Sequence, residues 1–197
     1  PPPLMITAFV DLPQALHPAL QYRIRFDFLK ALQNWSLWLY AAGSQERLLW
    51  QGYPNTLAYP DSHLIPRAYL TEGMDEWQRF MRGKWALMLR TLERFPEATH
   101  VAWIDFDALR YPLPPTLHPV MAHLRGRTIH LAAVNGEPDS GLIVLPRKHA
   151  KLMAREAEAI CQMDAALHRS FSEAARLKQR IRKVHDVFTL HPRLRQG

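Results

Sequence analysis

Two aspartates separated by one residue follow a short apolar run in the middle of the chain. Asp105 and Asp107 come directly after residues 101–104, which read Val-Ala-Trp-Ile. In an extended chain, residues two positions apart point to the same side, so both carboxylates can reach one cation. Carboxylate oxygens suit hard cations such as Mg²⁺ and Mn²⁺, which proteins often share with substrate phosphates. The spacing predicts a metal site, with the alternative that Asp105 caps a strand end and Asp107 is a solvated loop residue.

Other metal and nucleophile patterns are missing from the sequence. The ten histidines form no H-E-x-x-H motif and no i, i+4 pair beside an acid, and Cys161 is the only cysteine. A zinc enzyme is therefore not expected, an intramolecular disulfide is excluded, and Cys161 should be a buried side chain on an apolar helix stripe. The phosphate-loop, dinucleotide and serine-hydrolase glycine motifs are also absent, which argues against those three enzyme classes.

The elements that must position the aspartates alternate between strands and helices. This order predicts an α/β fold with right-handed crossovers, a largely parallel central sheet and helices on both faces. Ligands bind beyond the carboxyl ends of strands in such sheets, so Asp105 and Asp107 should face the end of the first strand. Residues 43–73 receive no assignment. The predicted strands cover residues 4–10, 35–40, 101–104, 128–134 and 142–145, and the predicted helices cover about 21–32 and 75–95.

The last quarter of the chain differs from the rest in composition. Only one of the 16 prolines, Pro192, follows Pro146, so residues 147–191 are predicted to be helical. The expected helices cover 148–161 and about 170–184, the second beginning at a capping box. Residues 147–197 hold 12 Lys and Arg against 5 Asp and Glu, so they carry the whole net charge of +7. We expect one domain over residues 1–197, with an α/β core at 1–146 and a basic helical layer at 147–197.

The basic layer suggests an acidic partner or a solvated helix face. A phosphate-bearing ligand, an anionic membrane surface and nucleic acid all fit its charge. Nucleic acid is the least expected, because the basic run lacks interleaved aromatic residues and a helix-turn-helix signature. With 48% hydrophobic residues, 22% charged residues and no apolar run near 20 residues, a globular protein is expected. The single cysteine favours the cytoplasm as the expected location, and the first residues show no signal-peptide pattern.

The aspartate pair and its surroundings also resemble a known family. The helix that contains Lys84 and the strand that ends in Asp105-Phe-Asp107 resemble the D-x-D region of GT-A fold glycosyltransferases. The strand at 4–10 resembles their first strand, and residues 133–145 resemble the element beside the donor sugar. Residues 185–190 are similar to a later segment that contains an acid. The resemblance follows the chain in order, and bacterial proteins of the HtrL/YibB type share it.

This resemblance implies a metal-dependent transferase that moves a sugar from a nucleotide-diphosphate donor to an acceptor, either a glycan or a small molecule. Mn²⁺ or Mg²⁺ would be held by Asp105 and Asp107, and a late histidine, His191, could complete the site. Asp186, or else Asp139, would take the proton of the acceptor hydroxyl. Basic side chains would face the diphosphate. The implied donor-binding residues are Ala8, Phe9, Val10, Arg25, Lys84, Asp105, Asn135 and Gly141.

Two other functions stay open at this point. The first is a nonenzymatic binding module whose basic C-terminal helices hold nucleic acid or make peripheral contact with an anionic membrane. The second is a transferase fold that serves only as a scaffold.

Overall fold

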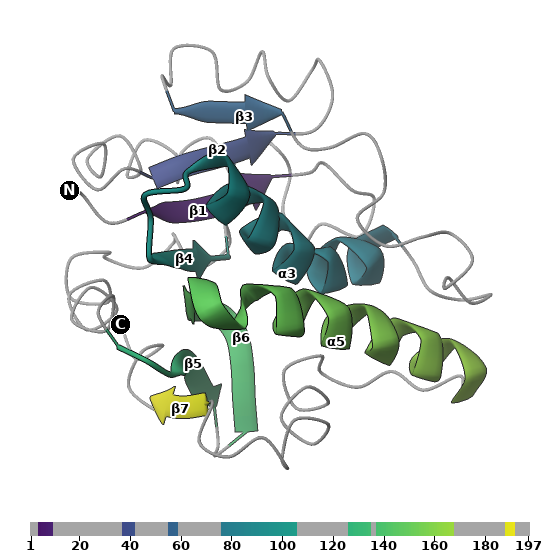
Figure 1. The fold of residues 1–197 in the computed structure, drawn as a ribbon. Coiled ribbons are helices and arrows are strands. Elements are labelled where there is room, and N and C mark those ends of the chain that lie inside the picture. The colour runs from purple at the N-terminus through teal and green to yellow at the C-terminus, as the bar shows by residue number, and fades with distance from the viewer. Residues whose placement is uncertain are drawn as a thin grey trace.

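The computed structural model describes residues 4–9, 37–41, 55–58, 76–105, 126–134, 137–167 and 188–191. Within these ranges the chain forms one sheet and a pair of long helices (Figure 1). The strands are β1 (Met5–Phe9), β2 (Leu37–Ala41), β3 (Thr56–Ala58), β4 (His100–Ile104), β5 (Ile129–Val134), β6 (Glu137–Pro146) and β7 (Phe188–His191). The helices are α3 (Glu76–Arg94) and α5 (Arg147–Leu167).

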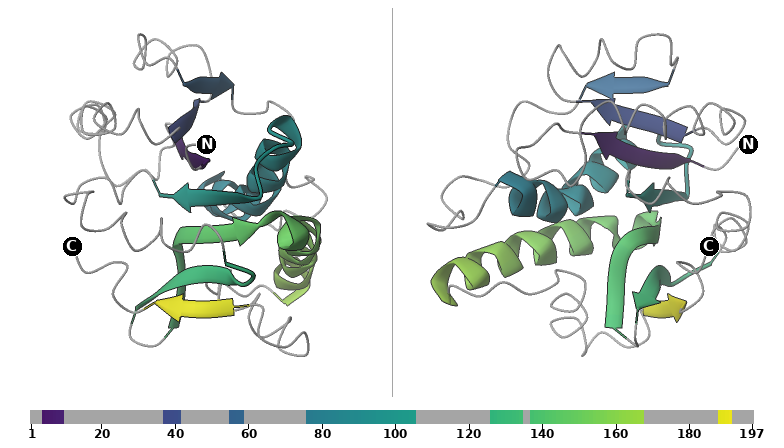
Figure 2. Two further views of the ribbon diagram at one scale, coloured as in Figure 1. Left: turned by 60° about the vertical axis from the view of Figure 1, so that its left-hand side comes forward. Right: turned by 180° about the vertical axis from the view of Figure 1, so that it is seen from behind.

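The sheet has seven described strands in the order β3-β2-β1-β4-β6-β5-β7, with β3 and β7 at opposite edges (Figure 2). Strands β1 to β4 pair in parallel, and β7 pairs in parallel with β5. Strand β6 is antiparallel to both of its neighbours, β4 and β5. The sheet is therefore mixed, and β6 is the one described strand that runs against the others.

The start and the direction of β6 differ from the expectation. The sequence predicts a largely parallel sheet whose fifth strand covers residues 142–145. Strand β6 instead begins at Glu137 and is separated from β5 by residues 135 and 136 alone. A parallel crossover needs a dozen or more residues, so a link this short forces an antiparallel hairpin.

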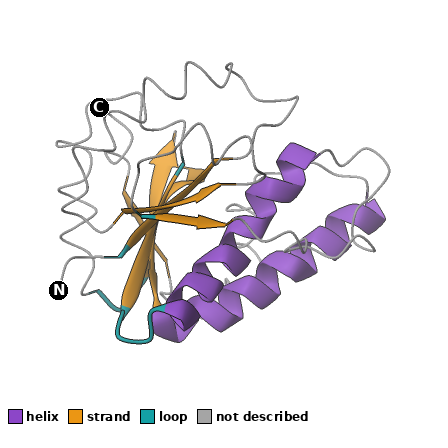
Figure 3. Cartoon of the chain, turned by 90° about the horizontal axis from the view of Figure 1, so that it is seen from above, coloured by secondary structure: helices purple, strands orange, loops and turns teal. Residues whose placement is uncertain are grey.

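Helices α3 and α5 pack side by side on one face of the sheet (Figure 3). Their buried side chains recur every three or four residues, as amphipathic helices require. Ala150 and Ala157 on α5 belong to the same core cluster as Met153, and their small side chains let this helix lie close to its neighbours. Over residues 83–94, where the side chains of α3 are described, the buried ones are Lys84, Trp85, Leu87, Met88, Thr91 and Leu92.

The opposite face of the sheet is buried too. Met5, Leu39, Ala102 and Val144 are at most 1% exposed, although they alternate with the residues that face α3 and α5. Strands buried on both faces are typical of α/β folds. The predicted helices at 21–32 and 170–184 lie outside the described residues, so the expectation of helices on both faces stays a prediction.

Part of the last quarter is strand, which contradicts the prediction that residues 147–191 are all helical. Helix α5 confirms the first predicted helix and extends it to Leu167, but residues 188–191 form β7 beside β5. Phe188 packs against the core cluster, and the hydroxyls of Thr189 and Thr128 lie 2.8 Å apart. An absence of proline permits a helix without requiring one, and here pairing at the sheet edge decides the conformation. Within the described residues, no helix is both long and apolar enough to cross a membrane.

Candidate functional site

Asp105 lies at the carboxyl end of β4, as the sequence predicts. Its main-chain N–H donates to the carbonyl oxygen of Gly141 on β6, at 2.9 Å. Its side chain is partly buried, and its Oδ1 accepts a hydrogen bond of 2.7 Å from the indole Nε1 of Trp103. Hydrogen bonds thus fix both the main chain and the side chain of Asp105, so its carboxylate has a defined orientation.

A buried cation lies behind this pair. Lys84 of α3 is 1% exposed, and its Nζ lies 6.0 Å from the centre of the Trp103 ring. At that distance a cation is attracted to the electron-rich face of an aromatic ring. The structure therefore links Lys84, Trp103 and Asp105 in series across the helix–sheet interface. A direct contact between Lys84 and a diphosphate stays a prediction.

Gly141 sits at an irregularity of the sheet beside Asp105. Leu131 on β5 pairs with Ile143, but the next residue, Ala132, pairs with Asp139. Three residues of β6, including Gly141, therefore lie between two consecutive pairs. Such bulges bend a strand and re-aim its residues, and glycine often occurs where another backbone approaches closely. On its other side β6 keeps a regular register with β4, where Ile104 pairs with Leu142, so the buried Gly141 meets the main chain of Asp105.

The carboxyl ends of β1, β4, β5 and β7 meet at one edge of the sheet, together with the start of β6. Ala8 and Phe9 end β1, which is the parallel neighbour of β4. Asp139 and His191 both pair with Ala132, from β6 and β7 respectively, so they share one row across three strands. Adjacent strands lie about 4.8 Å apart, which puts the two backbones roughly 10 Å from one another.

Several predicted site residues fall outside the described parts of the chain: Val10, Arg25, Asp107, Asn135 and Asp186. Within the described ranges, no three His, Cys, Asp or Glu side chains come together as a metal site. Of the three predicted metal ligands, only Asp105 has a described side chain. Its carboxylate is of the type that Mg²⁺ and Mn²⁺ prefer, and metal binding stays a prediction.

Trp103 is the site residue that sequence reasoning missed. It was counted as part of an apolar strand, and its indole N–H was not considered. The signal was present, because residues two apart in a strand share a face and Trp103 precedes Asp105 by two. A buried tryptophan also usually needs a partner for its N–H.

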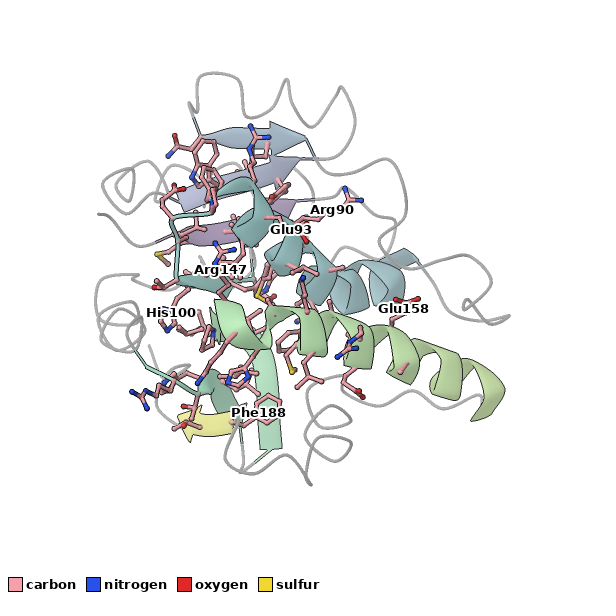
Figure 4. The ribbon with its side chains drawn as sticks, viewed as in Figure 1. Arg90, Glu93, His100, Arg147, Glu158 and Phe188 are labelled. Carbon is pink, nitrogen blue, oxygen red and sulfur yellow. The ribbon has the colours of Figure 1, made fainter. Side chains whose placement is uncertain are left out.

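The amino end of β4 carries a second polar cluster, around Arg147 (Figure 4). Arg147 Nε donates to the carbonyl oxygen of Ala98, and Nη2 donates to those of Leu92 and Phe95, each at 2.8 Å. These carbonyls follow the end of α3 or belong to its last turn, where helices leave acceptors without partners. Arg147 belongs to the basic last quarter, yet its guanidinium stabilises the turn between α3 and β4.

Two histidines fix the segment before β5. His100 Nε2 donates to the carbonyl oxygen of Gly126 at 2.6 Å, and His149 Nε2 donates to that of Arg127 at 3.0 Å. Both acceptors are main-chain groups. The amino end of β4 is thus tied to β5 and α5 by side chains that bond the backbone.

Solved structures with this fold include glycosyltransferases. A glycosyltransferase involved in the glycosylation of the major capsid of PBCV-1 matches with a TM-score of 0.58 and 9% identity, over 98% of this chain and 83% of its own. The apo form of mouse xyloside xylosyltransferase 1 matches with a TM-score of 0.55 and 12% identity, over 96% of this chain and 84% of its own. No protein-family model and no curated protein matches the sequence. The chain has a glycosyltransferase-like α/β fold.

Proposed function

We propose that this protein is a glycosyltransferase that uses a nucleotide-diphosphate sugar and a divalent cation. The observation that carries the proposal is the placement of Asp105 at the carboxyl end of β4, within a fold that matches two glycosyltransferases over nearly the whole chain. Ligands of open α/β sheets bind at this edge. Identities of 9% and 12% support a common fold, and the activity is our inference from the site.

Sugar transfer from such a donor breaks the bond between the anomeric carbon and a β-phosphate oxygen. Negative charge then grows on the leaving diphosphate, so groups that meet this charge stabilise the transition state more than the ground state. When bound, Mn²⁺ or Mg²⁺ supplies that positive charge as a Lewis acid. Asp105 and Asp107 would hold the cation, and His191, which ends β7 at the same edge, is the proposed third ligand.

The other proposed roles come from the resemblance to GT-A fold glycosyltransferases. The end of β1, at Ala8 to Val10, would hold the nucleoside, while Arg25 and Lys84 would offset the charge of the diphosphate. Asn135 and Gly141 would border the sugar. An acid must accept the proton of the acceptor hydroxyl as its oxygen attacks the anomeric carbon, and Asp139 on β6 and Asp186 are the two candidates. The proposed acceptor class is a glycan or small molecule, and the proposed location is the cytoplasm.

A direct test is a thermal-shift screen of nucleoside diphosphates, each with and without Mn²⁺. We expect one diphosphate to raise the melting temperature only when Mn²⁺ is present, since binding to the folded state alone stabilises it. Isothermal titration calorimetry with the same pair then gives the affinity. A shift with an oligonucleotide, and none with any diphosphate, would instead favour the binding-module function of the basic helices.

A further inference from the structure

The carboxylate of Asp105 is held by a donor that cannot move independently. Trp103 is 1% exposed and belongs to the core cluster between the sheet and α3, so packing restricts its ring. Its indole has a single N–H, which donates to Asp105 Oδ1. The distance of 2.7 Å lies at the short end of the range for hydrogen bonds to charged acceptors.

Lys84 restrains the same ring from its face. Its ammonium group lies 6.0 Å from the ring centre, and the lysine itself is 1% exposed. A cation in this position is attracted to the ring and has little water to weaken the attraction. The indole is therefore held by packing at its edges and by charge at its face, while its N–H points to the carboxylate.

We propose that Trp103 is a positioning residue for ligand binding, which fixes the Asp105 carboxylate through its indole N–H and is itself held in place by Lys84. The proposal rests on the proposed function, because it assumes that Asp105 binds a cation. Carboxylates that bind metals are commonly oriented by a hydrogen bond from a neighbouring group, and removing that neighbour typically lowers metal affinity about 10- to 100-fold. A fixed carboxylate binds without first losing rotational freedom, which is the origin of the effect.

The chain contains a matched control for this role. Trp85 lies next to Lys84 on α3, is 0% exposed and belongs to the same core cluster. Its Nε1 has no hydrogen-bond partner within the part of the protein that the structure describes. Both tryptophans lose the same atoms when phenylalanine replaces them, but only at Trp103 is a bond to a carboxylate lost.

The experiment compares Trp103→Phe with Trp85→Phe. Mn²⁺ affinity is measured by electron paramagnetic resonance, with the metal alone and with the nucleoside diphosphate that gives the largest thermal shift. All measurements are made well below each variant's melting temperature. We expect Trp103→Phe to weaken Mn²⁺ binding about 10- to 100-fold and Trp85→Phe to leave it within about twofold of wild type.

A replacement that preserves the ring covers the case in which Trp103→Phe fails to fold. Incorporating 3-benzothienylalanine at position 103 keeps the bicyclic shape and replaces the N–H by sulfur. The expected loss of Mn²⁺ affinity is the same, because only the donor has been removed. Lys84→Met is measured with Mn²⁺ alone, because Lys84 is also proposed to offset the charge of the diphosphate. We expect a smaller loss of Mn²⁺ affinity in the same direction, since this change removes one restraint on the ring and keeps its N–H.

The outcomes separate this inference from the proposed function. If wild-type protein binds neither Mn²⁺ nor any nucleoside diphosphate, the proposed function fails and the role of Trp103 fails with it. If wild-type protein binds both and the folded position-103 variants bind equally well, only the positioning role is wrong. Equal losses in the position-103 and Trp85→Phe variants would also overturn it, because they would show a general packing effect.

Discussion

The two ends of β4 use the polar groups of side chains in different ways. At the amino end, Arg147 and His100 donate to carbonyl oxygens of the main chain. At the carboxyl end, Trp103 donates to the side chain of Asp105. Main-chain carbonyls are fixed by the fold, so bonds to them stabilise the fold itself. A carboxylate is a ligand in its own right, so a bond to it orients a group that can bind something else.

The comparison teaches that polarity and charge alone do not mark a functional site. Arg147 is part of the basic last quarter that suggests an anionic partner, yet its guanidinium closes the turn between α3 and β4. Trp103 reads as a core residue, yet its one polar atom contacts the predicted metal ligand. The acceptor of each hydrogen bond, and not the charge of the donor, separates the two ends.

The largest expected effect is at the carboxyl end, from Asp105→Asn. The amide keeps the size of the side chain and an acceptor for Trp103, but it removes the charge that a cation needs. Losing one such ligand costs several kcal/mol of binding free energy, so affinity for the Mn²⁺–diphosphate pair should fall by about 10² or more. Calorimetry measures the affinity, and a melting temperature close to wild type serves as the control. Unchanged affinity for the Mn²⁺–diphosphate pair would show that the carboxyl end of β4 is not a ligand site.

The amino end should show the opposite response in Arg147→Ala. Three main-chain carbonyls lose a charged donor, which should lower the free energy of unfolding by about 2–3 kcal/mol and the melting temperature by roughly 5–10 °C. Affinity for the diphosphate at 20 °C should stay at the wild-type value. The neighbouring exposed Lys148→Ala is the matched control and should change neither quantity. A fall in diphosphate affinity without a fall in melting temperature would contradict a purely structural role for Arg147.

A smaller and pH-dependent effect is expected at Tyr40, whose hydroxyl lies 2.9 Å from that of Thr91. Thr91 in turn donates to the main-chain carbonyl of Leu87. Like Arg147 and His100, the Tyr40–Thr91 pair is therefore bonded to the main chain. Tyr40→Phe should cost about 1 kcal/mol at neutral pH, measured by urea unfolding.

Burial raises the pKa of Tyr40 above its usual value of 10.0, although its hydrogen bond with Thr91 and the nearby charges of Arg94 and Arg90 oppose the shift. The unfolded chain therefore ionises first, so wild-type stability should decline above about pH 10. The stability difference between wild type and Tyr40→Phe should narrow over that pH range. A constant difference up to pH 11 would contradict this assignment.

The smallest effect is expected on the outer face of α5, where Lys148, Lys151 and Arg155 form one exposed stripe. Replacing all three by glutamine should change stability by no more than about 0.5 kcal/mol per position and should leave diphosphate affinity unchanged. Any binding of the wild-type protein to oligonucleotides should be weak and should disappear at moderate salt. Fluorescence anisotropy at increasing salt measures it, and tight binding at physiological salt would show that this face is a third functional region.

Much of the sheet and α3 could be predicted from the sequence, because hydrophobic periodicity reports which side of an element is buried. Helix α3 and strands β4 and β5 lie within one or two residues of their predicted limits. The reversed direction of β6 follows from its two-residue link to β5, which a predicted strand start at 142 does not reveal. The pairing of β7 depends on contacts between distant segments, which periodicity does not encode. The three residues of β3 lie within the stretch at 43–73 that received no assignment.

The candidate site could also be predicted only in part from the sequence. Residue types and spacing identified Asp105 as a candidate ligand. Because ligands of such sheets bind beyond the carboxyl ends of strands, the sequence also predicted that Asp105 faces the end of β1. The burial of Lys84 could not be predicted, because a lysine on an amphipathic helix normally extends its amine to solvent. One of its contacts is the ring of Trp103, which comes 19 residues later in the chain.

The pairing of β1 with β4 has a consequence for the synthesis of the chain. Met5 pairs with Ala102, so one edge of β1 has no partner until about 97 further residues have been translated. At typical rates of roughly 5–20 residues per second, that delay lasts about 5–20 s. Met5 and Ile6 are both 0% exposed in the finished fold. During this interval they lack β4, the strand that pairs with β1 and helps to bury them. The nascent chain should therefore depend on chaperones most strongly before β4 emerges from the ribosome.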